Sequence, residues 1–168
     1  MKNKDKASYV KEEIARAFFQ LFEEKDFSEI SIKEITLKAQ VSRVSFYRNF
    51  TSKEDILRYY IQQKMSNWRH TTDLVKAPNF KLVIADLFEH YKQHSEFYLL
   101  LYKRGFSYLI LEDIQAVWGA RENQTNKNAY VYAYLTYGLF GWINEWFARG
   151  MQESTEGILR LFEEKDEK

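Results

Sequence analysis

Basic and hydroxyl side chains concentrate between Ser31 and Lys53, in a pattern suited to binding anions. Five basic residues and one acid, Glu34, give this stretch a local net charge of +4, whereas the whole chain carries only +1. The basic residues are Lys33, Lys38, Arg43, Arg48 and Lys53. Guanidinium, ammonium and hydroxyl groups are the donors that contact phosphates and base edges. The stretch therefore predicts a localised nucleic-acid-binding surface, since the near-zero net charge argues against binding by bulk electrostatics.

A second group of candidate chemistry is the pair His90 and His94, four residues apart, with Glu89 and Glu96 nearby. This is the helical spacing of a metal-binding pair, but a metal site needs further ligands and the chain has no cysteine. We expect these histidines at the surface, with no metal bound. The sequence also contains no glycine-rich phosphate loop and no nucleophile beside a base, so we expect neither an enzyme nor a cofactor.

The size and composition suit a small head followed by a second helical domain. The chain has 168 residues, of which 45% are hydrophobic and 17% aromatic, enough for a substantial core. The absence of cysteine suits a reducing compartment, and no apolar run follows the first residues, so we expect a cytoplasmic protein without a secretory signal. The uncharged run Tyr130–Asn144 is shorter than the roughly 20 residues a membrane helix needs.

Helical periodicity runs through the chain, and the predicted fold is all-α with about nine helices. Only one proline, Pro78, and six glycines interrupt it. The polar stretch Arg121–Lys127 is expected as a loop, and His70–Asn79 as the hinge between domains 1–60 and 61–168. The expected helices are 8–24, one starting at 32, 42–49, one capped by Thr51 or Ser52, 80–91, one capped by Ser95 and ending at 105, 108–118, 128–149, and one capped by Ser154 or Thr155.

The positions that frame the basic stretch carry helix-capping residues. Ser31 and Glu34 have the spacing of a capping box, and Ser42 is placed to cap the following helix. Two short helices joined by a tight turn, the second exposing polar and basic side chains, form a helix-turn-helix whose second helix enters the major groove of DNA. An αα-corner with a solvated outer face is the alternative interpretation.

The run Ala39–Leu57, A-Q-V-S-R-V-S-F-Y-R-N-F-T-S-K-E-D-I-L, resembles the signature of the TetR family of transcriptional regulators, roughly A-G-V-S-x-G-T-L-Y-x-H-F-x-S-K-E-x-L. The resemblance extends over about residues 8–60. It returns more loosely in Gly138–Gly141, Trp146–Met151 and Ser154–Ile158.

Three residues depart from that pattern. Gln40 replaces the usual turn glycine, which predicts a strained or altered backbone there at a cost of about 1 kcal/mol. Val44 and Asn49 also differ, and they affect the set of base contacts rather than the docking mode.

The DNA contacts follow from physical role, and the resemblance implies the same for the matched positions. Ser31, Tyr47 and Lys53 suit phosphate groups. The second helix of the motif, which Ser42 caps, is the reading helix. On it, an arginine can bind guanine with two hydrogen bonds, and Val44 can contact a thymine methyl group. Phe46 and Phe50 are expected in the core of the head. The remaining candidate base contacts are Ser42, Arg43, Ser45, Arg48 and Asn49.

One reading helix contacts few base pairs, so a symmetric homodimer on a palindromic operator is expected. Aromatic residues near the end of the chain are candidates for the interface, and Gly138 and Gly141 allow helices to approach closely. The resemblance implies a four-helix interface built from the last two helices of each subunit. The alternative is an ordinary core helix. The interface residues are Tyr130, Tyr137, Phe140, Ile143, Trp146 and Ile158.

The second domain is also expected to hold a small-molecule effector in an aromatic pocket. Its candidate lining is Tyr91, Tyr98, Tyr102, Trp118 and Tyr134. The sequence thus predicts a DNA-binding regulator, taken as a repressor that a small molecule modulates. Control by a protein partner and activation of transcription stay open as alternatives.

Overall fold

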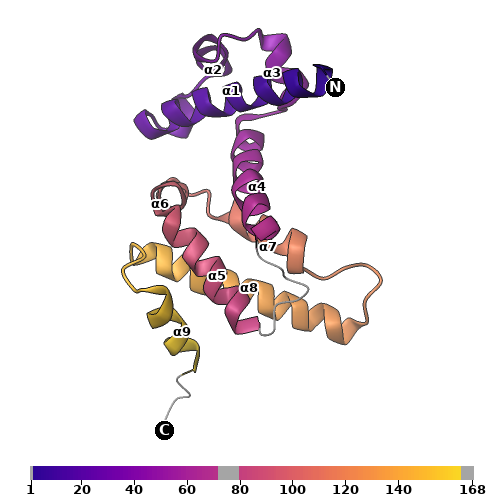
Figure 1. The fold of residues 1–168 in the computed structure, drawn as a ribbon, viewed down its shortest axis with the longest axis vertical. Helices are drawn as coiled ribbons and strands as arrows, with labels where there is room; N and C mark the ends of the chain where they lie inside the picture. The colour runs from indigo at the N-terminus through magenta and orange to yellow at the C-terminus, as the bar shows by residue number, and fades with distance from the viewer. Residues whose placement is uncertain (1, 72–79, 164–168) are drawn as a thin grey trace. The chain divides into compact units, whose positions relative to one another are not determined.

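The computed structural model describes residues 2–71 and 80–163 of the chain (Figure 1). Over these ranges the protein is all-α, as predicted, with nine α-helices, one short 3-10 helix and no strand. The elements are α1 (Lys2–Glu24), η1 (Phe27–Glu29), α2 (Ile32–Lys38), α3 (Arg43–Asn49), α4 (Lys53–Thr71), α5 (Phe80–Gln93), α6 (Ser95–Lys103), α7 (Tyr108–Trp118), α8 (Asn126–Ala148) and α9 (Thr155–Glu163).

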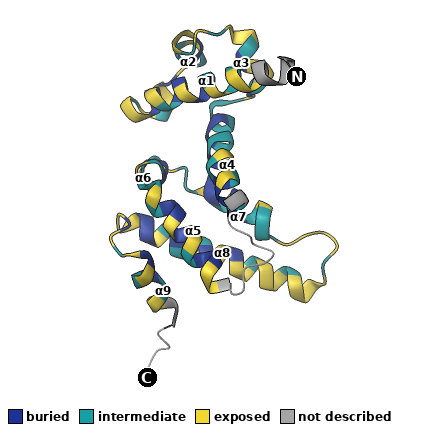
Figure 2. Cartoon of the chain, in the orientation of Figure 1, coloured by how far each residue is buried: buried dark blue, intermediate teal, exposed yellow. Residues whose placement is uncertain are grey.

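The chain separates into two compact units, Met1–Gln63 and Lys64–Lys168. In the first unit, α1 packs against α2 and α3. Ile14, Phe18 and Phe22, spaced by one helical turn each, are fully buried, and the rings of the two phenylalanines stack with centroids 5.4 Å apart. Burying one such side chain contributes about 1.5–3 kcal/mol, so this stripe makes α1 the base on which the two short helices rest (Figure 2).

The predicted caps of the short helices are confirmed. Ser31 and Glu34 form a reciprocal capping box at the start of α2, and the Ser42 side chain accepts a hydrogen bond from the Ser45 amide at the start of α3. Of the two options for α4, Ser52 supplies the oxygen that accepts from the Asp55 amide. These side chains satisfy amides that would otherwise lack partners, and so set where each helix begins.

Helix α2 ends in a Schellman motif with Gln40 in the left-handed region at φ 54°. The Gln40 amide donates to the Leu37 carbonyl, and the Val41 amide donates to the Thr36 carbonyl. Helices α6 and α8 end in the same way, but with Gly105 and Gly150 at the left-handed position. The predicted strain at Gln40 is thereby confirmed, since this motif normally uses glycine there. The predicted left-handed cap at Gly150 is confirmed as well.

The second unit is built around α8, against which α6 and α7 pack, while α9 packs on α5. Its core is rich in aromatic rings. Phe88 and Trp146 lie 5.1 Å apart, and Tyr91 meets Phe147 edge to face at 5.7 Å. In the described ranges, no helix is long and apolar enough to cross a membrane.

Several boundaries differ from the sequence-based expectations. Helix α1 begins at Lys2 rather than Ser8, and α8 begins at Asn126 because Thr125, within the expected loop, caps it. Ser95 is the first residue of α6 rather than its cap. In α9, the Ser154 hydroxyl oxygen accepts from the Gly157 amide, so Ser154 is the capping residue. Most of the expected hinge, residues 72–79, lies outside the described residues.

Candidate DNA interface

Helix α3 has one face in the core of the head and one face in solvent. Phe46 is fully buried and Phe50 nearly so, as predicted, and their rings lie 6.1 Å apart. Val44 and Tyr47 are exposed to 60% and 59%. Positions three and four residues apart share a face of a helix, so Val44 lies on the same face as Tyr47 and Arg48. The outward face of α3 therefore consists of Arg43, Val44, Tyr47 and Arg48.

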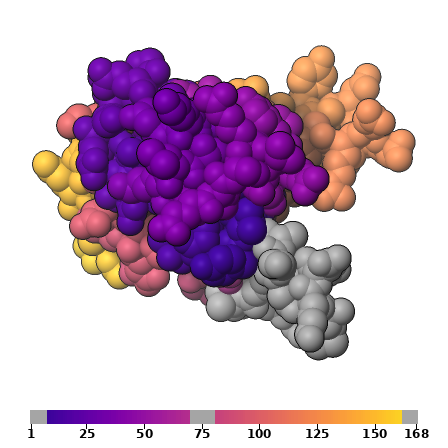
Figure 3. All heavy atoms as spheres, turned by 90° about the horizontal axis from the view of Figure 1, so that it is seen from above, coloured from indigo at the N-terminus to yellow at the C-terminus, as the bar shows by residue number. Residues whose placement is uncertain are grey.

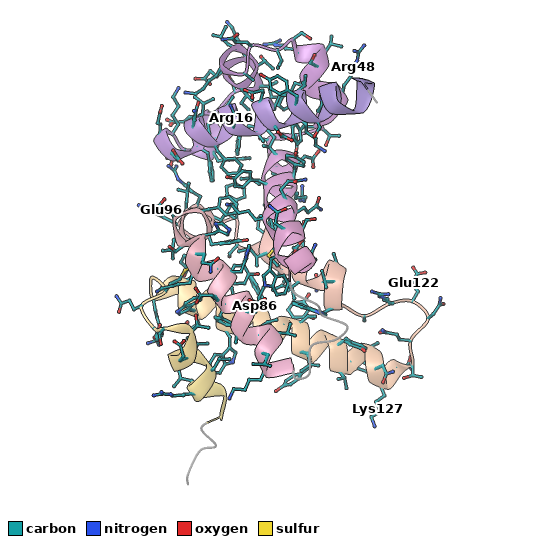
Figure 4. All side chains as sticks on the ribbon, viewed as in Figure 1. Arg16, Arg48, Asp86, Glu96, Glu122 and Lys127 are labelled. Atoms are coloured by element: carbon teal, nitrogen blue, oxygen red, sulfur yellow. The ribbon has the colours of Figure 1, made fainter. Side chains whose placement is uncertain are left out.

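The polar residues of α3 have bonds inside the helix. The Ser42 hydroxyl donates to the Ser45 hydroxyl at 3.3 Å and accepts from the Ser45 amide at 3.1 Å. The Asn49 side-chain amide donates to the Ser45 carbonyl at 2.8 Å. Ser42, Ser45 and Asn49 thus stabilise the helix, and of the three Ser42 is exposed whereas Ser45 and Asn49 are half-buried. The free basic groups at this surface belong to Arg43 and Arg48, the second labelled in Figure 4.

Ser31 lies in a small ionic network at the start of α2. Its hydroxyl donates to the Glu34 carboxylate at 2.8 Å, and Lys25 Nζ lies 2.7 Å from the same carboxylate. The hydrogen bond from Lys25, with further bonds from Ser31, lowers the pKa of Glu34 to about 2. Glu34 therefore stays ionised at neutral pH, and a phosphate approaching Ser31 meets a hydroxyl that already donates to a carboxylate.

Lys53 holds the first turn of α4 to the segment before α2. Its ammonium donates to the carbonyls of Phe27 and Ile30, and it lies 4.3 Å above the Phe27 ring. Two of the three ammonium N–H bonds are thus used within the head. The sequence did not predict that Lys53 would bind inside the head, because the two carbonyls lie more than 20 residues earlier in the chain.

The exposed face of α2 carries Lys33 and Lys38 of the predicted basic stretch, and also Leu37, which the sequence analysis did not single out. Lys33 and Leu37 lie four residues apart on this face, next to Lys38, and Leu37 is 77% exposed. The surface of the unit is shown in indigo and purple in Figure 3. The sequence signal for this surface was Leu37, an apolar residue that does not share the inward positions taken by Ile35 and Thr36.

Taken together, a capped helix lies on a buried aromatic base with arginines, a valine and a tyrosine directed outward. Two comparisons with known families agree with this geometry. Residues 14–60 match the family described as "Bacterial regulatory proteins, tetR family", and residues 79–164 match the one described as "Transcriptional regulator C-terminal region". The chain belongs to the TetR family. Within the matched residues 14–60, α2 and α3 are the helix-turn-helix of this family of regulatory proteins.

Relatives of this TetR-family protein include two regulators of Bacillus subtilis (strain 168). The HTH-type transcriptional regulator YerO is 33% identical over an alignment of 99 residues, and the match covers 54% of this chain and 34% of YerO. The HTH-type transcriptional regulator YxbF is 30% identical over 70 residues, 41% of this chain and 18% of YxbF. The matches therefore span about a third of the first relative and less than a fifth of the second.

Among solved structures, a TetR transcriptional regulator from Streptococcus agalactiae 2603V has a similar fold. The TM-score is 0.56 with 17% sequence identity, over 96% of each chain. At this identity the likeness concerns the fold, and it extends from the helix-turn-helix to the last helices.

Of the five residues predicted for an aromatic pocket, Tyr91, Tyr98 and Tyr102 pack around the ring of Phe147. Tyr91 and Tyr98 are buried in the core, with rings edge to face at 4.6 Å. Trp118 meets Trp68 at 6.2 Å, and Tyr102 meets Phe147 at 6.4 Å. Tyr134 lies apart from the other four on α8 and is 79% exposed, so its assignment to a shared pocket is corrected.

The predicted dimer residues of α8 divide between its two faces, and Ile158 lies in α9. Tyr130 and Tyr137 are 78% and 56% exposed, and Phe140 is half-buried. By contrast, Ile143, Trp146 and Ile158 lie in the core of a single chain, so they offer a partner almost no surface and their assignment is corrected. The reason is helical geometry, because Ile143 and Trp146 continue the inward stripe that includes Thr136 and Leu139.

Proposed function

We propose that this regulator is a repressor that binds a palindromic operator as a homodimer in the cytoplasm, with a small molecule in the second domain modulating DNA binding. Residues 1–60 form the DNA-binding domain and residues 61–168 the regulatory and dimerisation domain. The observation that supports this most directly is the outward face of α3, because its side chains combine base-reading and phosphate-binding groups on a rigid support.

Each outward residue of α3 has a chemical role in the proposed complex. Arg43 and Arg48 carry planar guanidinium groups that can donate two hydrogen bonds to O6 and N7 of guanine. Val44 offers an apolar surface that suits a thymine methyl group. The exposed Tyr47 donates to a phosphate, and the remaining N–H of Lys53 adds a charged contact. The hydroxyls of Ser31 and Ser42 donate to phosphates when they rotate away from Glu34 and Ser45, the acceptors they have in the free protein.

Dimerisation is supported by the outer face of α8. Tyr130, Tyr134 and Tyr137 recur on this face with exposures of 56–79%, followed by Gly138 and Gly141 on the same side. A Cβ atom built at either glycine would have no described neighbour within 4 Å. Glycine inside a helix costs roughly 1 kcal/mol relative to alanine, and nothing within the described chain requires it here. Close contact with a helix of a second copy explains why both positions are glycine.

DNA binding is tested with the intergenic DNA next to the gene that encodes this chain. Fluorescence anisotropy should show tighter binding to that DNA than to random duplex, with affinity falling steeply as salt rises. Arg48→Ala should weaken specific binding at least tenfold. The matched control is Arg16→Ala, which removes an exposed arginine of α1 that pairs with Glu13 (Figure 4). Equal affinity for both DNAs, or equal losses in both variants, would exclude the proposed reading helix.

Dimerisation has a separate test that needs no DNA. Native mass measurement of the full chain should give twice the mass of 20.3 kDa. Gly141→Leu, which adds bulk on the outward face where the single chain has open space, should convert the protein to a folded monomer. Gln152→Leu serves as control, since it changes an exposed residue between α8 and α9. A dimer that persists in Gly141→Leu would place the interface elsewhere.

Repression itself is tested with a reporter gene placed behind the bound DNA. Loss of the regulator should raise expression, because a dimer seated over a promoter excludes polymerase. A fall in expression on removal would instead identify an activator.

A further inference from the structure

A polar cleft of about 280 Å³ lies between the second half of α4 and helix α5. With the exception of Trp68, every residue that lines it has a polar or charged side chain. The groove between α8 and α9 is different, because Trp142, Trp146, Ile158 and Leu161 contribute much of its lining. The cleft at α4 and α5 is therefore the better candidate for a small polar ligand.

Three basic side chains meet at one end of this cleft. Lys64 Nζ of α4 lies 3.4 Å from Nδ1 of His94, the residue between α5 and α6. The rings of His94 and His90 lie edge to face with centroids 4.9 Å apart, and His90 Nε2 lies 3.1 Å from the Tyr98 hydroxyl. His90 is only 7% exposed, so the expectation of a surface histidine is wrong for this residue. Three nitrogen bases thus share one partly desolvated space.

Burial lowers the pKa values of all three groups, and the neighbouring bases lower those of the two histidines further. Burial, with the nearby His94 and Lys64, lowers the pKa of His90 to about 4, although Asp86 acts in the opposite direction. Burial and then Lys64 lower the pKa of His94, and burial lowers the pKa of Lys64. An anion bound among these groups would offset both effects, because it favours their charged forms.

The acidic residues of the cleft, Asp86 and Glu89 of α5, precede both histidines in the chain and accept hydrogen bonds from donors of the protein. Asp86, labelled in Figure 4, accepts a hydrogen bond from Trp68 Nε1 at 2.9 Å. Glu89 accepts from the Thr155 hydroxyl at 3.0 Å and from the Gln93 side chain. Asp86 precedes Gln93, the last residue of α5, by seven residues, or about 10 Å along the helix at 1.5 Å per residue. A second negative group on a ligand would be repelled there, whereas an amine would be attracted.

We infer that the cleft binds a small monocarboxylate, whose oxygens accept hydrogen bonds from Lys64 Nζ and His94 Nδ1 and whose other end, neutral or amine-bearing, lies toward Glu89 and Asp86. Binding of the acid does not depend on the proposed function. Its role as the effector does rest on that function. Helix α4 carries Lys64 in one half and begins in the head at Lys53, so a ligand on Lys64 contacts a helix shared by both units.

Three four-carbon probes test the chemical class: butyrate, succinate and 4-aminobutyrate. Each is titrated to about 10 mM, a concentration that detects millimolar dissociation constants, into the full chain labelled with ¹⁵N-histidine. Saturable shifts of the His94 ring nitrogens are expected with butyrate and more strongly with 4-aminobutyrate, and weaker binding with succinate. Because binding takes up a proton, affinity should fall about tenfold for each pH unit above the pKa of His94.

Two variants and one control assign the binding to this site. Lys64→Met should weaken binding at least tenfold, and His94→Gln, which keeps an amide donor, should abolish its pH dependence. Lys81→Met, an exposed lysine of α5 outside the cleft lining, should change neither. Circular dichroism establishes that each variant is folded. Absence of saturable shifts with all three probes, equal binding of succinate, or unchanged binding by Lys64→Met would overturn the inference. None of these measurements contains DNA, so failure here leaves the proposed DNA-binding function standing.

Discussion

The Val41 amide donates to the Thr36 carbonyl at 3.0 Å, and this bond closes helix α2 around Gln40. The bond requires a left-handed residue between the two helices of the DNA-binding motif, and the chain supplies glutamine, at φ 54°. The turn therefore keeps its geometry at the cost of backbone strain at Gln40.

Gln40→Gly should raise the free energy of unfolding by about 0.5–1 kcal/mol. Glycine removes the left-handed strain from the folded state, and this gain is larger than the stability lost because glycine makes the unfolded chain more flexible. Gln40→Ala keeps a Cβ atom and should leave stability nearly unchanged. Urea denaturation followed by circular dichroism measures both. A destabilised glycine variant would show that the glutamine side chain contributes more than its backbone strain costs.

Glu34 should make the stability of the protein depend on acid pH. Its pKa in the folded protein, about 2, lies below its ordinary value of 4.5, chiefly because of the hydrogen bond from Lys25. The stabilisation is thus fully present above about pH 4.5 and is lost as the pH falls toward 2. Glu34→Gln should be less stable than the parent at pH 6, and the difference should narrow between pH 4.5 and 3. A difference that does not vary with pH would refute the ionic contribution.

Val44→Ala should reduce discrimination for thymine in the operator. The lost methyl groups correspond to about 1 kcal/mol of contact with a thymine methyl group. Footprinting locates the half-site, and anisotropy then compares thymine with uracil at each position for the parent and the variant. At one position in each half-site the uracil penalty should disappear in Val44→Ala. Penalties that stay equal at every position would remove Val44 from the base contacts.

The ion pair between Arg69 and Asp113 should be important for the second unit. Their side-chain atoms lie 2.5 Å apart, with 28% and 8% of the two side chains exposed, and they join α4 to α7. Arg69→Met should destabilise the protein by about 2–4 kcal/mol, because it leaves the Asp113 carboxylate buried and unpaired. Adding Asp113→Leu should recover much of that loss.

The control for this pair is Arg16→Met, which breaks the exposed pair with Glu13 and should cost less than about 1 kcal/mol. A double-mutant cycle from chemical denaturation gives the coupling energy. Additive losses in the double variant would show that the two charges act independently.

Local chemistry in the sequence determined much of this protein. The capping box of Ser31 and Glu34, the Ser42 cap and the inward spacing of Phe46 and Phe50 were all predicted, because they depend on residues a few positions apart. The same holds for the strain at Gln40. These features place the reading helix, and the family comparison agrees with them.

Only the tertiary structure decided which groups meet across long stretches of chain. Lys53 binds carbonyls 23 and 26 residues away, and Lys64 lies beside His94, 30 residues further along. Likewise, the aromatic spacing of α8 predicted a contact face but not which face the core would take, so Trp146 was assigned to an interface. Helical periodicity specifies that residues share a face, whereas the neighbour of that face is set by packing between distant segments.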